Sequence, residues 1–334
     1  MTAPVIFGCE GLEISEFEKA FFREMAPWGF ILFRRNLAGA DQITRLCSEL
    51  RASVGWRAPI FIDQEGGRVA RLTAPLAHEF LPALDMVEAL GPDPQTQRRG
   101  MWIRARVIAD DLTKLGIDGN CAPLGDIAYA DTHAVIKNRC YGQTAAQVAN
   151  NARAVAEATL AGGVLPVLKH MPGHGRAMLD SHKDLPIVEG ELKDLKLSDF
   201  DAFSQLRDLP LGMTAHVVFP SLDPEHPVTQ SPKAIDYLRR ELGFDGLLMT
   251  DDLSMEALNG TPKARAEASL GAGVDLVLHC NGKPHEMLNV AEGIGTLAGP
   301  ALKRVEAAEA LRTAPEVIDI PALEAELEAL ISTG

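Results

Sequence analysis

Short apolar runs alternate with segments of helical periodicity along the whole chain. The runs lack the polar alternation of a half-exposed strand, which is typical of parallel strands that are buried on both faces. There are eight such runs, at residues 5–9, 29–33, 59–62, 119–123, 164–168, 211–218, 246–249 and 275–278. Because a (β/α)₈ barrel needs eight parallel strands, the pattern predicts an α/β protein built as a single TIM-type barrel.

The segments between the runs carry apolar residues at the three- and four-residue spacing of an amphipathic helix. Two of these apolar stripes are Ile14, Phe17, Phe21 and Met25, and Ile43, Leu46, Leu50 and Val54. Ser231 and Pro232 have the form of a helix cap and a first-turn proline, and Gly243 follows the end of that helix. We expect the stripes to pack against the outside of the barrel. Individual elements can be irregular or missing, and helices should continue from about residue 284.

An open, doubly wound sheet is the alternative arrangement of the same elements. A sheet of that kind that binds dinucleotides carries G-x-G-x-x-G after its first strand, and Gly8 and Gly11 do not have this spacing. Gly271 and Gly273 are better explained as a turn from a helix to a strand. We therefore prefer the barrel and expect no cofactor.

Composition narrows the choice of partner and compartment. The 334 residues include 46 Asp plus Glu and 32 Lys plus Arg, a formal charge of −14, which opposes binding to nucleic acid. The five cysteines form no C-x-x-C pair and are expected to be free thiols in a reducing compartment. The first residues are rich in glutamate where a signal peptide would be apolar, and no segment approaches the ~20 apolar residues of a membrane span. We expect a cytoplasmic monomer that acts on a small molecule and binds neither nucleic acid nor membrane.

Polar clusters follow three of the eight runs, at the strand ends where a barrel places its active site. They are 63–68 with Arg71 close behind, 169–175, and 250–252. Charged residues cost little at any strand end, so one cluster alone means little. Three clusters on one rim, with a lysine, histidines and paired aspartates, predict an active site.

The loop that begins with the cluster at 169–175 continues to Asp180-Ser181-His182, in which one residue separates an aspartate from a histidine. In an extended segment this spacing directs both side chains to the same side. The aspartate can then fix the imidazole tautomer and raise its pKa, which makes the histidine a usable general acid and base. A surface Asp–His pair is the structural alternative.

A zinc site is a further alternative for the same loop. Its ligands would be His170, His174, Asp180 and His182. The H-x-H pair usual in metal-dependent hydrolase barrels is absent, so no metal is expected.

A carboxylate on the opposite side of the pocket is expected from Asp251 or Asp252. Adjacent strand residues point to opposite faces, so only one of the two should face the pocket. A carboxylate nucleophile with a separate proton donor is the arrangement of a retaining glycosidase.

Five motifs together resemble glycoside hydrolase family 3, and more narrowly its bacterial cytoplasmic β-N-acetylglucosaminidases, the β-hexosaminidases of peptidoglycan recycling. They are D-Q-E-G-G-R-V-A-R at 63–71, N-R-C-Y-G at 138–142, K-H-M-P-G-H-G at 169–175, D-S-H at 180–182 and T-D-D-L-S-M at 250–255. The resemblance spans about residues 5–285. It implies that residues 1–334 form one catalytic barrel domain with a C-terminal helical extension.

The resemblance also implies residue roles. Asp251 matches the family's nucleophile, His182 its proton donor and acceptor, and Asp180 the residue that orients this histidine. The positions that hold the terminal sugar are matched by Asp63, Arg71, Arg139, Lys169 and His170. His174 and His216 are expected to have structural or loop-ordering roles. The implied substrate is a muropeptide fragment in which N-acetylglucosamine is linked to anhydro-N-acetylmuramic acid.

The chain departs from the family pattern at a few positions. Met171 and Cys140 replace a more usual phenylalanine and serine, and 176–178 replaces a common Gly-Asp-Thr-like continuation. The last change concerns loop dynamics or leaving-group preference. Many relatives take a carboxylate donor from a second domain, whereas this chain is expected to find its acid within a barrel loop, and we predict that residues 170–184 move to close over the sugar. A phosphorylase of the same family and a silent sugar-binding barrel are the competing functions.

Overall fold

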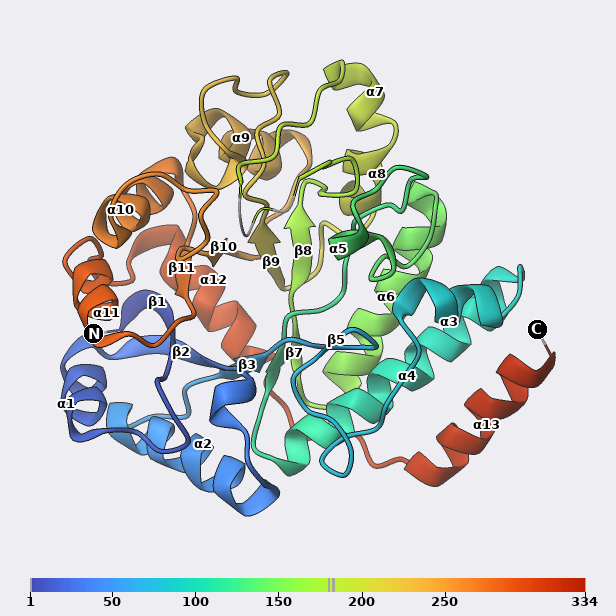
Figure 1. Cartoon of the computed structure of the whole chain (residues 1–334), viewed down its shortest axis with the longest axis horizontal. Coiled ribbons are helices and arrows are strands. Elements are labelled where there is room, and N and C mark those ends of the chain that lie inside the picture. The colour runs from blue at the N-terminus through green and yellow to red at the C-terminus, as the bar shows by residue number, and fades with distance from the viewer. Residues whose placement is uncertain (1, 180, 182–183, 334) are drawn as a thin grey trace.

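Parallel strands form a closed barrel in the computed structural model, which describes residues 2–179, 181 and 184–333. The strands are β1 (Ala3–Gly8), β2 (Pro27–Leu32), β3 (Ile60–Ile62), β6 (Gly119–Asn120), β7 (Leu165–Pro166), β8 (Leu168–Met171), β9 (Leu211–Thr214), β10 (Leu247–Asp252) and β11 (Leu276–His279). Their order is β7-β6-β3-β2-β1-β11-β10-β9-β8. Only Val167 separates β7 from β8, so the two share one position and the order closes on itself. All eight predicted runs therefore supply a barrel strand within the described residues, and the TIM-type fold is confirmed (Figure 1).

Helices surround the strands, as the predicted stripes require (Figure 1). They are α1 (Glu16–Met25), α2 (Ala40–Val54), α3 (Ala83–Ala89), α4 (Pro94–Lys114), α5 (Ala134–Lys137), α6 (Ala145–Ala161), α7 (Leu192–Lys196), α8 (Asp199–Ser204), α9 (Pro232–Asp236), α10 (Pro262–Ala272), α11 (Pro284–Ala291), α12 (Gly299–Ala310) and α13 (Ile320–Thr333). Ser231 caps α9 by accepting the Ala234 backbone N–H at 3.0 Å, and Gly243 has φ +82°, as the sequence indicated. Phe17 was expected to pack against the barrel with the rest of its stripe, and this is wrong. Its side chain is 38% exposed and stacks on the buried ring of Phe21.

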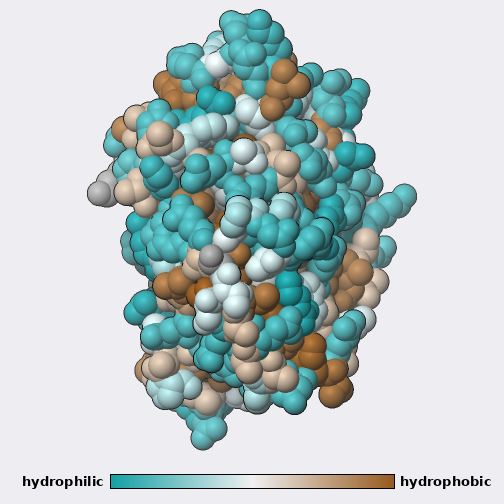
Figure 2. Space-filling view, turned by 90° about the vertical axis from the view of Figure 1, so that its right-hand side faces the viewer, coloured by the Kyte–Doolittle hydropathy of each residue, from teal (hydrophilic) through white to brown (hydrophobic). Residues whose placement is uncertain are grey.

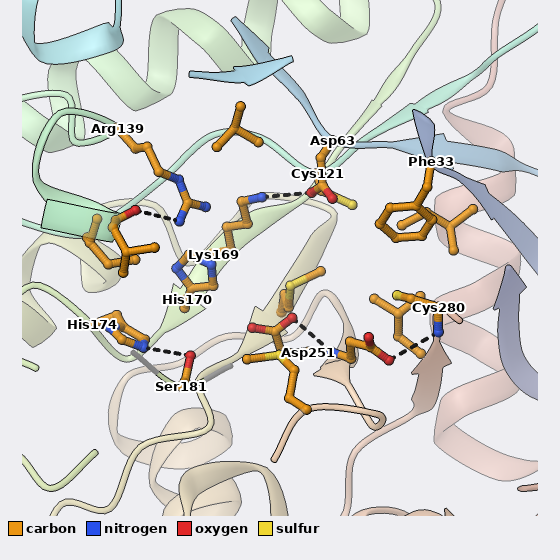
Figure 3. A pocket seen from close by; sticks show the side chains of 18 of the residues that line it. Phe33, Asp63, Cys121, Arg139, Lys169, His170, His174, Ser181, Asp251 and Cys280 are labelled. Carbon is orange, nitrogen blue, oxygen red and sulfur yellow. Dashed lines mark hydrogen bonds and ion pairs between the residues drawn. The ribbon is translucent and has the colours of Figure 1, made fainter. Parts of the chain in front are cut away.

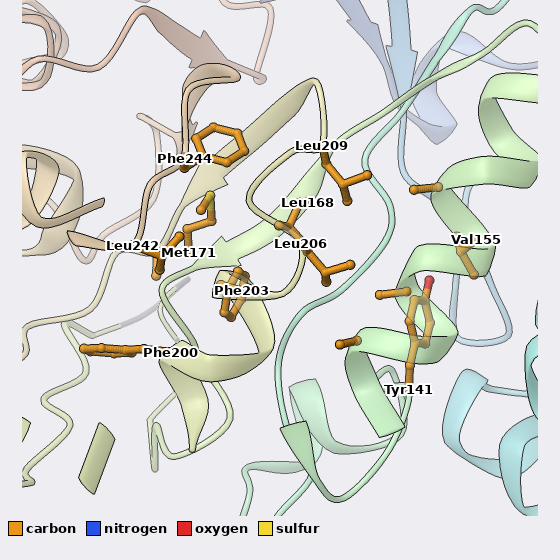
Figure 4. Close-up of a cluster of buried hydrophobic side chains, with 14 of the residues drawn as sticks. Tyr141, Val155, Leu168, Met171, Phe200, Phe203, Leu206, Leu209, Leu242 and Phe244 are labelled. Carbon is orange, nitrogen blue, oxygen red and sulfur yellow. The ribbon is translucent and has the colours of Figure 1, made fainter. Parts of the chain in front are cut away.

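Two apolar layers hold the barrel together. Inside the barrel, Phe61, Met213 and Met249 belong to a buried cluster that also contains Val305 and Ala308 of α12. Outside it, aromatic and aliphatic side chains fill the space between β8, β9 and helices α6 and α8 (Figure 4). Burial of this surface is the main force that fixes the strands, and with them the residues at the strand ends.

The C-terminal helices lie on the outside of the barrel. α13 packs along α4, where Leu323 and Leu327 are buried and Glu326 receives two 2.7 Å hydrogen bonds from Arg99 (Figure 1). Among the described residues, none of the helices combines the length and apolar character that crossing a membrane would require. The face in Figure 2 is mostly hydrophilic, with separate apolar patches.

Two strands extend further than their apolar runs. The fifth run was expected to end at Leu168, but β8 continues through Lys169 and His170 to Met171. β10 likewise continues through Asp251 and Asp252. These polar residues stay in the sheet because each of their side chains finds charged or hydrogen-bonding partners at the strand end. A small antiparallel hairpin, β4 (Gln64–Gly66) and β5 (Val69–Ala70), follows β3 and was not predicted.

Candidate active site

A cavity of about 290 Å³ lies at the carboxyl ends of the barrel strands (Figure 3). It is lined by all six of the predicted site residues that the structure describes, namely Asp63, Arg71, Arg139, Lys169, His170 and Asp251. The volume is close to the lower end of the ~300–1,000 Å³ range of small-ligand pockets, so it suits a compact ligand such as one sugar ring. The structure therefore brings the predicted residues together, although it does not assign their roles.

Asp63 is held between two cations at the end of β3. Its Oδ1 lies 3.0 Å from Lys169 Nζ, and its Oδ2 accepts a 2.9 Å hydrogen bond from Arg71 Nη2. Burial acts to raise the pKa of the Asp63 carboxyl, but the charges of Lys169 and Arg71 outweigh it and hold that pKa well below its usual value. The carboxylate is therefore ionised and fixed in place.

Glu65, for which the sequence predicted no role, completes this charged cluster. Its two oxygens accept hydrogen bonds of 2.8 and 2.9 Å from Arg139, and Oε1 also lies 2.7 Å from Lys169 Nζ. Burial alone would raise the pKa of Glu65, but Arg139 and Lys169 lower it to about 2. Glu65 thus orients two of the predicted sugar-binding cations. Its only sequence signal was its place in the motif at 63–71.

The same two carboxylates fix the charge state of Lys169. Burial acts to lower the pKa of its ammonium group, but Glu65 and Asp63 raise it above the usual value. Lys169 is therefore a permanent cation that bridges the two acids. Such a lattice of fixed donors and acceptors matches a ligand rich in hydroxyl groups.

A second missed residue, Asp126, orients His170. Asp126 is fully buried, and its Oδ2 lies 2.7 Å from His170 Nδ1. Because a carboxylate accepts hydrogen bonds, Nδ1 carries a proton here, and this fixes the plane of the ring. The sequence signal was an isolated aspartate between apolar residues, Leu124 and Ile127.

Asp251 and Asp252 both line the cavity, but their carboxylates have different hydrogen-bond partners. Asp252 is occupied by the turn after β10: Oδ1 accepts the backbone N–H groups of Ser254 and Cys280 at 2.9 and 3.1 Å, and Oδ2 accepts the Ser254 hydroxyl. Asp251 accepts one hydrogen bond within the described residues, from the Asp252 backbone N–H at 2.8 Å. Of the two aspartates, Asp251 is the one with a carboxylate available to a ligand.

The surroundings of Asp251 favour its ionised form. Burial acts to raise the pKa of this carboxyl, but His216, His170, the Asp252 N–H and Lys169 together lower it below the usual value. His216 also supports the backbone here, since its Nε2 lies 3.0 Å from the Asp252 carbonyl oxygen and its Nδ1 lies 2.8 Å from Thr229 Oγ1. These contacts accord with the structural role expected of His216.

Asp180 and His182, the predicted orienting residue and proton donor, lie outside the described residues. Ser181 between them is described; it is buried and lines the cavity. The predicted movement of 170–184 stays a prediction. Within residues 2–179, 181 and 184–333 there is no group of three His, Cys, Asp or Glu side chains placed to hold a metal ion, and two of the four candidate zinc ligands fall outside this part of the chain.

Comparison with known proteins gives one consistent result. The glycosyl hydrolase family 3 N terminal domain matches residues 15–310. A β-hexosaminidase of Bordetella avium (strain 197N) is 33% identical over 321 residues, which cover 94% of this chain and 90% of that protein.

Solved structures agree with this family. NagZ from Neisseria gonorrhoeae in complex with N-trifluoroacetyl-D-glucosamine superposes with a TM-score of 0.84 at 28% identity, covering 99% of this chain and 97% of that one. A glycoside hydrolase family 3 β-N-acetylglucosaminidase from Paenibacillus sp. str. FPU-7 gives a TM-score of 0.85 at 30% identity. That alignment covers 99% of this chain and 66% of the Paenibacillus protein.

Proposed function

Because this chain belongs to glycosyl hydrolase family 3 and is a glycoside hydrolase of the β-N-acetylhexosaminidase type, we propose that it is a retaining exo-β-N-acetylglucosaminidase. It removes terminal, non-reducing N-acetylglucosamine through a covalent glycosyl-enzyme intermediate. The single observation that carries this proposal is Asp251, an ionised carboxylate that faces the cavity while its neighbour Asp252 is held by a turn. A carboxylate of this kind can attack an anomeric carbon.

In the first step, Asp251 attacks the anomeric carbon from one side of the sugar ring as the bond to the leaving oxygen breaks. His182 donates a proton to that oxygen, so the aglycone leaves as a neutral alcohol. In the second step, the same imidazole removes a proton from water, and the hydroxide displaces Asp251 with a second inversion. The two inversions give net retention of the anomeric configuration. Asp180 stabilises the protonated imidazole that acts in the first step and fixes the tautomer of the neutral ring that acts in the second.

The remaining residues bind the terminal sugar. Asp63 and Glu65 fix the charge and position of Lys169, and Glu65 also holds Arg139. We assign Asp63, Arg71, Arg139, Lys169 and His170 to the sugar hydroxyls and the acetamido-bearing ring. Because these groups are paired before a ligand enters, binding requires little reorganisation of the site. The complex of the Neisseria NagZ with an N-acylated glucosamine supports an amino sugar as the ligand.

The natural substrate proposed is a muropeptide-type fragment in which N-acetylglucosamine is joined to anhydro-N-acetylmuramic acid, as in peptidoglycan recycling. The proposed location is the cytoplasm and the proposed state a monomer. All five cysteines are buried and unpaired, which supports a reducing compartment. Light scattering of the purified protein tests the monomer, and a mass near twice that of the chain would reject it.

The experiment that tests the activity compares aryl β-glycosides of N-acetylglucosamine, glucose and xylose. We expect rapid release from the N-acetylglucosaminide alone, with the β-anomer as the first product detected by NMR. Release of the α-anomer first would reject retention, and absence of release would favour a sugar-binding barrel. A sugar phosphate formed only in phosphate buffer would identify a phosphorylase instead, since a histidine donor is neutral after it gives up its proton and does not repel phosphate.

A further inference from the structure

His174 joins the sugar-binding side of the cavity to the segment that carries the predicted donor. Its backbone N–H donates to Asp126 Oδ1 at 2.7 Å, and the other oxygen of Asp126 binds His170. On its far side, His174 Nε2 and Ser181 Oγ lie 3.2 Å apart in a hydrogen bond, drawn in Figure 3. Ser181 is the sequence neighbour of both Asp180 and His182. A continuous chain of contacts therefore runs from His170 to the middle of the D-S-H motif.

The two residues that follow His174 make close contacts with other parts of the chain. The Gly175 carbonyl oxygen accepts the Thr132 hydroxyl at 2.6 Å, and a Cβ atom at Gly175 would lie 2.1 Å from the Ile127 carbonyl oxygen. Arg176 then binds Asp199 at 2.6 Å and lies over the ring of Tyr129. These contacts fix the position of residues 174–176 against the loop that contains Asp126.

Beyond Ala177, the described side chains at positions 178 and 179 are largely exposed. Met178 is 57% exposed and Leu179 is 47% exposed, although both side chains are apolar. Ser181, in contrast, is buried at the cavity wall. Among the described residues, its hydroxyl is hydrogen-bonded to His174.

We propose that His174 is a positioning residue for the proton donor: its hydrogen bond holds Ser181 at the cavity wall, and Ser181 is the residue that precedes the predicted donor His182 in the chain. This inference rests on the proposed function, because it requires an acid at His182. His174 is fully buried, and burial together with the nearby His170 lowers its pKa to about 4. The ring is therefore neutral at working pH and acts as a hydrogen-bonding strut without exchanging protons with the substrate.

The test compares two substrates that differ in their need for an acid. A disaccharide of N-acetylglucosamine has a poor leaving group and needs protonation, whereas a dinitrophenyl glycoside leaves without it. We expect Ser181→Ala and His174→Leu each to lower kcat on the disaccharide about tenfold, with less than about a twofold change on the dinitrophenyl glycoside. His174→Gln, whose amide can reach the position of Nε2, should restore part of the loss. The double variant should lose no more kcat on the disaccharide than the less active of the two single variants, since both substitutions break the same contact.

Two controls separate the proposal from general damage and from failure of the proposed function. Ser53→Ala removes a buried hydroxyl that bonds to Leu50 on α2, and it should leave both rates unchanged. If wild type cleaves neither substrate, or if His182→Ala slows both equally, the proposed function or its donor fails. If His182→Ala is selective but Ser181→Ala is not, or if the losses of the two single variants add, the role of His174 is overturned. The midpoint of thermal unfolding, measured for each variant, identifies any that merely unfold.

Discussion

Both ends of the barrel contain buried ion pairs between carboxylates and cations, but these pairs have different roles at the two ends. At the amino ends of the strands, Asp118 precedes β6 and accepts hydrogen bonds from Arg51 at 2.9 Å and Arg312 at 2.6 Å, as well as from the Ile60 backbone N–H at 2.9 Å. Asp275 precedes β11 and binds Arg304 in the same way. At the carboxyl ends, the carboxylates of Asp63, Glu65 and Asp251 lie at or beside a cavity.

The two ends differ in whether their charged side chains can contact a ligand. Asp118 and Asp275 each combine arginines with a backbone N–H of the neighbouring strand, so they tie strands and helices together. The carboxyl-end cluster is also paired, but Asp63, Arg139 and Lys169 line open volume. In this fold the amino end serves stability and the carboxyl end serves chemistry. Residue type alone therefore does not identify a catalytic carboxylate, whereas the strand end on which it lies does.

The largest effect is expected from Asp251→Asn. The amide keeps the oxygen that accepts the Asp252 N–H but is a far weaker nucleophile, so kcat on an aryl N-acetylglucosaminide should fall by about 10³-fold or more. The thermal midpoint should stay within a few degrees of the wild-type value. A near-normal rate, together with an inactive Asp252→Asn, would transfer the nucleophile to Asp252.

Glu65→Gln should reduce both activity and stability, because Arg139 and Lys169 lose a buried counter-charge. We expect kcat/KM to fall by about 10- to 100-fold, mainly through a higher KM, since positioning of the sugar is lost. The free energy of unfolding should fall by about 3 kcal/mol in urea titrations. Unchanged KM would show that Glu65 does not organise the sugar-binding cations.

Asp118→Asn should distinguish the roles of the two ends most clearly, because it disrupts a comparable ion-pair cluster that lies far from the cavity. We expect a loss of about 2–3 kcal/mol in the free energy of unfolding, with kcat/KM within about twofold of wild type at a temperature where the variant is folded. Glu157→Gln, which breaks a partly exposed pair with Arg98, is the matched control and should cost less than about 0.5 kcal/mol. A large activity loss in folded Asp118→Asn protein would contradict the division between the two ends.

The smallest effect is expected in the acid dependence of stability. The pKa of Glu65 in the folded protein is about 2, below its usual value of 4.5, because Arg139 and Lys169 outweigh the effect of burial. Its contribution to stability is therefore fully present above pH 4.5 and is lost as the pH falls toward 2. Urea titrations across this range should show a shallower decline for Glu65→Gln than for wild type. Parallel declines would show that Glu65 is not ionised preferentially in the folded state.

The strands could be predicted from the sequence because each depends on a local run of apolar residues. The polar ends of β8 and β10 could not, since their partners are distant in the chain: Lys169 pairs with Asp63 and Glu65, and Asp252 accepts the Cys280 backbone N–H. Glu65 and Asp126 were missed for the same reason: Arg139 lies 74 residues from Glu65 and His170 lies 44 residues from Asp126. The residues predicted to act on the sugar came from sequence motifs, whereas Glu65 and Asp126, which hold several of them, became visible only in three dimensions.

The central claim is that Asp251 forms a covalent bond with the sugar, and trapping that intermediate tests it most directly. The wild-type protein is incubated with a fluorinated N-acetylglucosaminyl fluoride, which forms the glycosyl-enzyme faster than water releases it. Mass spectrometry of the intact protein and of its peptides then locates the added sugar. We predict one sugar per chain, attached to Asp251 and absent from Asp251→Asn. Attachment to Asp252 or to another residue, or turnover of the fluoride with no adduct and with inversion of configuration, would contradict the account.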